Sequence, residues 1–133
     1  MYNSQPGSIL NIKNFTMKSE QLYTIPTREN AELRAKAAPE IIDAWRNFSR
    51  TVFKAGALDE KTKQLIAVAV AHVTQCPFCI HSHTGQAMKK GASKEEIMEA
   101  VWVASEMRAG AAYAHSTLAM DEIMASENSN KPV

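Results

Sequence analysis

Residues 60–83 read EKTKQLIAVAVAHVTQCPFCIHSH, and this stretch decides the fold. Its first part, from Glu60 to about Thr74, is rich in alanine and valine and nearly apolar, which is typical of a helix at the centre of a small protein. A second helix is expected to begin at Cys76 or the next residue and to run to Lys90, where Gly91 ends it. The stretch therefore predicts two consecutive helices joined by a short turn.

Outward from this pair, the chain also predicts helices. A short helix is expected from about Glu29 to Lys36, and Pro39 can open another, because proline is tolerated in a first turn. Gly56 is a candidate C-terminal cap for the helix that begins at Pro39, and Asp59 is a candidate N-cap for the apolar helix that begins at Glu60. The helix that begins at Pro39 should have one apolar face, formed by Ile41, Trp45, Phe48 and Val52.

The C-terminal part of the chain also predicts helices. Ser93, with Glu96 three residues later, has the form of a capping box at the start of a helix. Gly110 is expected to break or bend that helix before a last one from about Ala111 to Ala125. No segment favours a strand, so the sequence predicts an all-α fold, a bundle of about six helices.

Length and composition place the chain among small globular proteins. It has 133 residues, is 45% hydrophobic and carries a formal net charge of +1. These values predict one helical domain over 28–133, preceded by an irregular N-terminal arm over 1–27, and give no electrostatic case for nucleic acid. No apolar run is long enough for a membrane span, and the first residues lack a secretory pattern, so we expect a cytoplasmic protein.

Two cysteines and a histidine share one helix face. Because each residue of a helix advances about 100°, Cys76 and Cys79 should lie about 60° apart, with His83 on the same side. His81, by contrast, points about 160° away from Cys79. The three side chains should therefore converge, with His83 as the histidine of the group.

This grouping favours thiol redox chemistry. The unpaired N–H groups and positive dipole end of a helix N-terminus stabilise a thiolate, which is the nucleophilic form of cysteine. The spacing of Cys76 and Cys79 lets their sulfurs meet as a reversible disulfide. His83 can take a proton from a thiol or return one to a leaving group.

Zinc binding is the competing interpretation of these residues. Cys76, Cys79 and His83 supply three potential ligands, and His72 or His115 could supply a fourth. Ligands crowded into the first turns of one helix fit a structural zinc site poorly, and His72, in an apolar helix, is better interpreted as a hydrogen-bonded core residue. We therefore expect neither a metal nor another cofactor.

At these residues the chain resembles the AhpD-like, carboxymuconolactone decarboxylase superfamily. The resemblance runs from about Ala38 to Met120, around KTKQLIAVAVAHVTQCPFCIHSHTGQAMKKGASKEEIMEAVWVASEMRAGAAYAHS, whose specific core is CxxCxxxH. It implies an all-helical fold that assembles as trimers or hexamers. It also implies a peroxidase in which the second cysteine, Cys79, attacks a peroxide and the first, Cys76, resolves the product as a disulfide, with His83 in a proton relay.

Two positions depart from the pattern of that family. Where the family usually has a glutamate, this chain has Gln64, which can hydrogen-bond but cannot take up a proton near neutral pH. Glu60, one turn earlier on the same helix face, is a candidate substitute in the relay. Phe78 stands where some peroxidases of the family have a histidine between the cysteines.

The leading hypothesis is a thiol-dependent peroxidase that reduces a hydroperoxide and is restored by an external thiol or protein reductant. Lactone decarboxylation, found elsewhere in the superfamily, is a second hypothesis, although it needs no CxxC. A third is a redox-sensing protein in which the disulfide alters subunit contacts. In each case we expect a homo-oligomer, because the apolar helix faces exceed what one small domain buries. We expect no nucleic-acid or membrane partner.

Overall fold

The computed structural model describes residues 27–129, and all of its regular structure is helical. The described residues contain no strand, which confirms the predicted all-α class for this part of the chain. Nearly all of the expected N-terminal arm, residues 1–26, lies outside the described residues. The chain divides into two compact units, Met1–Ile42 and Asp43–Val133.

The first unit contains α1 (Arg28–Ala37) and the first turn of α2 (Pro39–Phe53). Thr27 caps α1, because its hydroxyl accepts the backbone N–H of Asn30 at 3.1 Å. Pro39 occupies the first position of α2, where its missing N–H costs no hydrogen bond. The two helices begin close to the residues that the sequence indicates.

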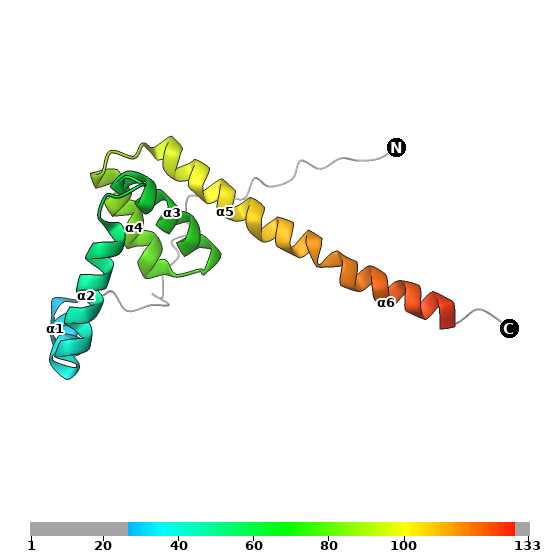
Figure 1. Cartoon of the computed structure of the whole chain (residues 1–133), viewed down its shortest axis with the longest axis horizontal. Helices are drawn as coiled ribbons and strands as arrows, with labels where there is room; N and C mark the ends of the chain where they lie inside the picture. Colours follow the sequence, from blue (N-terminus) through cyan, green and yellow to red (C-terminus); the bar gives the residue numbers. More distant parts are fainter. Residues whose placement is uncertain (1–26, 130–133) are drawn as a thin grey trace, which may run out of the picture. The chain divides into compact units, whose positions relative to one another are not determined.

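The second unit is built around α3 (Glu60–Val73), which packs against both α4 (Pro77–Lys89) and α5 (Lys94–Ala114). Figure 1 shows α3 and α4 side by side, with α5 running past them. Val68 is fully buried, and the other buried apolar residues are the alanines Ala71, Ala87 and Ala104. The central position predicted for the apolar helix is confirmed, and small residues let the three helices approach closely.

Local capping fixes where these helices begin and end. The carboxylate of Asp59 accepts the N–H of Thr62 at 2.7 Å, as expected of an N-cap. Gly91 has a φ of 86°, in the left-handed region that glycine adopts at little cost, and it ends α4. The capping box of α5 is complete: the Ser93 hydroxyl accepts the Glu96 N–H, and the Glu96 carboxylate accepts the Ser93 N–H.

The end of α2 differs from the expectation. The helix ends at Phe53, three residues before Gly56, so Gly56 is not its C-terminal cap. The ammonium of Lys63 instead donates to the carbonyls of Val52 and Lys54, at 2.7 Å each. A cation from α3 thus satisfies backbone acceptors at the negative end of the α2 dipole, a contact that local sequence cannot reveal.

The predicted break at Gly110 is also wrong. α5 continues through Gly110 to Ala114, and α6 (Ser116–Ser129) follows after His115 alone. α6 extends α5 in nearly the same direction (Figure 1). A glycine inside a helix costs about 1 kcal/mol relative to alanine, which a helix of 21 residues can absorb.

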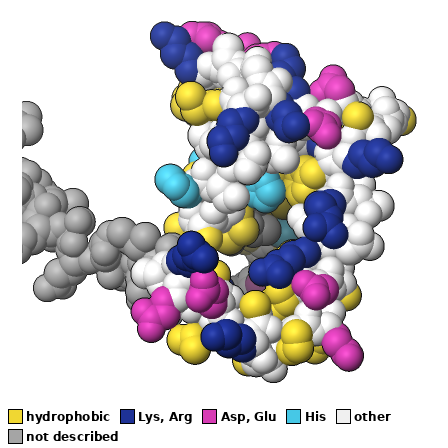
Figure 2. All heavy atoms as spheres, turned by 90° about the vertical axis from the view of Figure 1, so that its left-hand side faces the viewer, with side chains coloured by type: hydrophobic (Ala, Val, Ile, Leu, Met, Phe, Trp, Pro, Cys, Tyr) yellow, Lys and Arg dark blue, Asp and Glu magenta, His cyan; other side chains and the backbone are white. Residues whose placement is uncertain are grey.

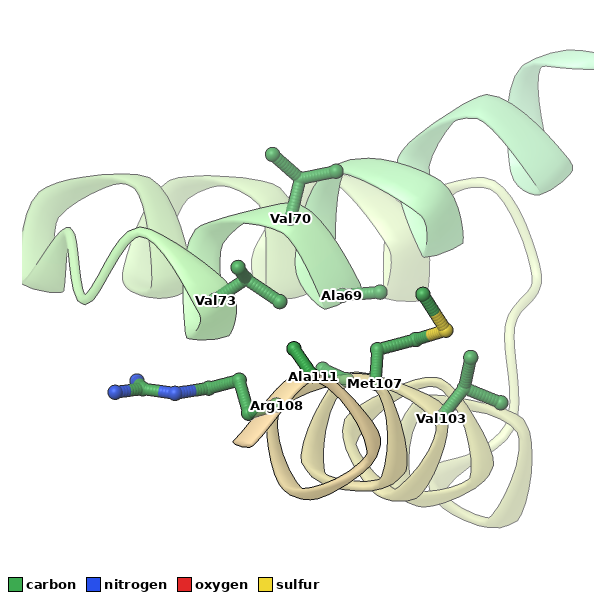
Figure 3. Close-up of a pocket in the computed structure, with 8 residues that line it drawn as sticks. Ala69, Val70, Val73, Val103, Met107, Arg108 and Ala111 are labelled. Carbon is green, nitrogen blue, oxygen red and sulfur yellow. The ribbon is translucent and has the colours of Figure 1, made fainter. Parts of the chain in front are cut away.

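Large apolar side chains remain exposed over much of the described surface. They lie among charged side chains on the face shown in Figure 2. A groove of about 360 Å³ runs between α3 and α5, where Ala69 and Val73 face Met107 and Ala111 (Figure 3). Trp45 and Trp102 are 62% and 69% exposed, so neither belongs to the core of the described chain.

Within residues 27–129, none of the helices is long and apolar enough to cross a membrane.

Candidate thiol site at the start of α4

The two cysteines occupy the first turn of α4 and form a disulfide. Cys76 is the N-cap residue and Cys79 lies three residues later, with their Cα atoms 5.3 Å apart. The Cys76 sulfur accepts the backbone N–H of Cys79 at 3.3 Å. A sulfur at an N-cap thus takes the place of the usual serine or aspartate oxygen, and the helix N-terminus favours negative charge on it.

A tight turn between α3 and α4 sets the position of the cysteines. Gln75 adopts a φ of 55°, and the N–H of Cys76 donates to the Ala71 carbonyl at 3.1 Å. This left-handed residue closes the end of α3 in the way that a glycine commonly does. Because the turn is short, α4 folds directly back along α3, and residues one or two turns into α4 come to lie beside α3.

His83 is held against α3 by a hydrogen bond. Its Nδ1 lies 2.8 Å from Oε1 of Gln64, and the amide oxygen accepts the proton that Nδ1 donates. Gln64 is only 6% exposed, whereas His83 is partly buried. Burial lowers the pKa of His83 below its ordinary value, because the charged imidazolium loses hydration. The structure thus brings together two residues that the sequence singled out.

Phe53 is a member of the site that sequence reasoning missed. Its ring stacks on the His83 imidazole, with ring centroids 5.0 Å apart and planes inclined by 30°. The Lys63 ammonium holds the carbonyls on either side of Phe53, which fixes this end of α2. The contact joins residues distant in sequence, so no local signal could have indicated it.

The remaining candidates occupy other positions. The Glu60 carboxylate forms an ion pair with Lys90, and its role in proton relay stays a prediction. His72 donates from Nδ1 to the Val68 carbonyl at 2.8 Å, which agrees with a hydrogen-bonded helix residue. His81 is exposed, as its position on the opposite side of the helix predicts. His115 is exposed at the end of α5.

The geometry of the site supplies no preformed metal centre. Among the described residues, no three side chains of the types His, Cys, Asp or Glu are grouped so that they could hold a metal ion. What the arrangement does supply is a pair of joined sulfurs at a helix N-terminus and an oriented histidine one turn further along the same helix.

Comparison with known proteins places this site in a recognised sequence context. Residues 39–122 match the carboxymuconolactone decarboxylase family, a segment that includes both cysteines, Gln64 and His83. An uncharacterized protein of the cox locus of Paracoccus denitrificans is 60% identical over 92 residues, which span 67% of this chain and 83% of that protein. A protein of Haemophilus influenzae is 38% identical over 86 residues, which span 65% of this chain and 76% of that protein.

Two solved structures have a similar arrangement of helices over part of this chain. A protein from Methanobacterium thermoautotrophicum has a TM-score of 0.62 and 31% identity, over 68% of this chain and 98% of that one. A carboxymuconolactone decarboxylase family protein from Legionella pneumophila, solved in its apo form, has a TM-score of 0.57 and 37% identity, over 59% of this chain and 70% of that one. Sequence and fold therefore point to the same group of proteins.

Proposed function

The chain belongs to the carboxymuconolactone decarboxylase family, and from this premise we propose that it is a thiol-dependent oxidoreductase of the alkylhydroperoxidase type. It reduces a hydroperoxide through a reversible Cys76–Cys79 disulfide. The observation that carries the proposal is the disulfide at the N-terminus of α4, with the Gln64-bound His83 one turn beyond it. Oriented base and paired sulfurs are what such chemistry needs.

In the oxidative half of the cycle, the Cys79 thiolate attacks the terminal oxygen of the hydroperoxide. The O–O bond breaks, the sulfur becomes a sulfenic acid, and the departing alkoxide takes a proton to leave as the alcohol. The Cys76 thiolate then attacks the Cys79 sulfur. The S–S bond forms, the S–O bond breaks, and the hydroxide leaves as water after protonation.

The two sulfurs have different surroundings, which suits different roles. Cys76 is the N-cap, where the N–H of Cys79 and the helix dipole favour its thiolate as the resolving nucleophile. Cys79 lies four residues before His83, and side chains at that spacing are neighbours on a helix. His83 can therefore accept the Cys79 proton and return it to the alkoxide.

The reductive half requires an external thiol or a protein reductant. Its thiolate attacks the Cys79 sulfur to form a mixed disulfide, and Cys76 leaves as a thiolate. The N-cap position stabilises that leaving group, which speeds thiol–disulfide exchange. A second reductant thiol then releases Cys79, so that the reductant is oxidised to a disulfide and both cysteines are reduced.

The experiment follows the two thiols directly. Reduced protein is mixed with a small panel of peroxides, and loss of thiols is followed together with the intact mass, which falls by two hydrogens when the disulfide forms. Cys79→Ser should abolish oxidation by peroxide. Cys76→Ser should stop at a sulfenic acid on Cys79, which dimedone traps. Thiols that ignore every peroxide would contradict the proposal.

Lactone decarboxylation is the second candidate, because the family takes its name from that reaction. It does not depend on a pair of cysteines. Decarboxylation of a carboxylated lactone that persists in a Cys76→Ser, Cys79→Ser double variant would favour it over the peroxidase proposal. The reduced wild-type chain and the double variant should otherwise have the same helical content.

A further inference from the structure

The contact between Gln64 and His83 has a direction that decides which histidine nitrogen is available. The amide oxygen of Gln64 is an acceptor only, so the His83 nitrogen 2.8 Å away, Nδ1, carries the proton. A neutral imidazole has one proton on its two nitrogens, which leaves Nε2 with a free lone pair. Stacking on Phe53 fixes the plane of the ring as well.

We propose that Gln64 is the positioning residue of the thiol site: it holds His83 as the Nδ1–H tautomer, directs Nε2 to serve Cys79, and keeps the reduced pair of Cys79 and His83 uncharged. The inference rests on the proposed thiol chemistry and says that Gln64 sets the reactivity of Cys79. The residue acts through His83, since its own amide neither accepts nor releases a proton near neutral pH.

Because Gln64 carries no charge, it affects how readily His83 accepts the proton of the Cys79 thiol. When the Cys79 thiol gives its proton to Nε2, the products are a thiolate and an imidazolium. A carboxylate at Nδ1 would stabilise that imidazolium, whereas the neutral amide of Gln64 contributes only a hydrogen bond. Burial lowers the pKa of His83 in the same direction. The equilibrium therefore stays on the side of neutral thiol and neutral imidazole.

The charged side chains around His83 are engaged elsewhere. Glu60 and Lys63 both precede Gln64 on α3, but Glu60 pairs with Lys90, and Lys63 binds carbonyls at the end of α2. The other ion pair between packed helices joins Lys61 of α3 to Glu96 of α5 at 2.7 Å. On α4 itself, His81 is exposed. None of the carboxylates in these contacts is therefore available to stabilise a charged His83 in place of the neutral Gln64.

The test measures the thiolate without any peroxide. In a Cys76→Ser background, iodoacetamide alkylates the Cys79 thiolate with loss of iodide, and the rate is measured at about pH 7. Gln64→Glu should raise that rate about tenfold or more, because a neighbouring opposite charge shifts a pKa by about one to three units. Gln64→Met removes the acceptor at similar volume and should lower the rate. Ser105→Glu adds the same charge at an exposed position of α5 and should change it little.

Opposite effects of two substitutions at one position separate positioning from simple support of the fold. If Gln64 only filled space, both variants would loosen the site and both rates would fall, which would overturn the proposal. Circular dichroism and thermal unfolding establish that each variant is folded before its rate is compared.

The second measurement is made on the unaltered chain, so it decides the matter even if the Gln64 variants do not fold. Nitrogen-15 chemical shifts of the His83 ring distinguish the two tautomers. The expected result is the Nδ1–H form, and a dominant Nε2–H form would overturn the proposal. Neither readout involves a hydroperoxide, so a chain that ignores peroxides would refute the proposed peroxidase activity while this control of Cys79 by Gln64 could still be demonstrated.

Discussion

At the scale of single residues, the partly buried imidazole of His83 links the site to the stability of the fold. Burial lowers its pKa in the folded chain below the ordinary value of about 6.5 that it regains on unfolding. Between these two pKa values the unfolded chain binds more protons. The contribution of His83 to stability is therefore present above about pH 6.5 and is lost as the pH falls through the folded-state pKa.

We expect this loss to appear as a fall in the free energy of unfolding as the pH is lowered below about 6.5, measured by urea denaturation. His83→Gln should flatten the dependence in that window. His81→Gln, an exposed histidine two residues away, should leave it unchanged. An equal slope in the wild-type chain and in His83→Gln would contradict the assignment. The pKa values of Asp59 and Glu96 are lowered by hydrogen bonds, so their effects fall at more acid pH.

The residues of the site differ in how far sequence could reveal them. Cys76, Cys79 and His83 belong to one helix, so their spacing alone predicts that they share a face. Gln64 was identified through the family resemblance, and its contact with His83 depends on how α4 folds back on α3. The sequence did not predict Phe53 as part of the site, because its ring contacts His83 only when Lys63 holds the end of α2.

At the scale of elements, the cation that closes α2 is the contact with the clearest consequence. Lys63 donates to the carbonyls of Val52 and Lys54, which flank Phe53. We expect Lys63→Met to lower the free energy of unfolding by about 1 kcal/mol, since it removes charge-assisted bonds from a largely hydrated site. The same change should broaden the NMR signals of the His83 ring, because Phe53 is no longer fixed against it.

Lys54→Met is the matched control, because Lys54 is an exposed lysine at the same helix end whose backbone carbonyl, and not its ammonium, takes part in the contact. It should change neither stability nor the His83 signals. If Lys63→Met proved as silent as Lys54→Met, the cap would have no energetic role.

Local signals predicted the helices well wherever the cap lies within a few residues. Asp59, Gly91 and the pair Ser93 and Glu96 all act as expected, since each satisfies a backbone group of its own first or last turn. The two failures, Gly56 and Gly110, have a common cause. A glycine permits a helix to end but does not require the helix to end there. α2 ends earlier, at Phe53, where Lys63 binds its carbonyls, and α5 continues through Gly110 to Ala114.

At the scale of the whole molecule, the described residues bury little. Val68 is the largest side chain that is fully enclosed, while apolar residues such as Ile66, Val70, Val103 and Met107 are 47% to 61% exposed. Each of the six helices in the described part of the chain carries at least one large apolar side chain that is exposed. Such surface is more than a monomer of this size usually exposes, so the expectation of a homo-oligomer, trimer or hexamer, stands as a prediction.

Light scattering coupled to size exclusion provides the test. We expect a mass that is a multiple of the 14.7 kDa chain, with copies of the chain covering the apolar groove between α3 and α5. Val70→Glu should weaken the assembly, because it places a charge where apolar surface is buried. Ser105→Glu adds the same charge to α5 outside the lining of the groove and serves as the control. A strictly monomeric wild-type chain would refute the expectation.

The central claim is that the Cys76–Cys79 disulfide is the product of a reaction with a hydroperoxide. The most direct measurement is the intact mass of the reduced chain after brief exposure to a stoichiometric organic hydroperoxide, with Cys79→Ser and Cys76→Ser in parallel. We predict loss of two hydrogens in the wild-type chain, no change in Cys79→Ser, and a dimedone-reactive sulfenic acid in Cys76→Ser. A reduced wild-type chain that keeps its mass and both thiols would contradict the account.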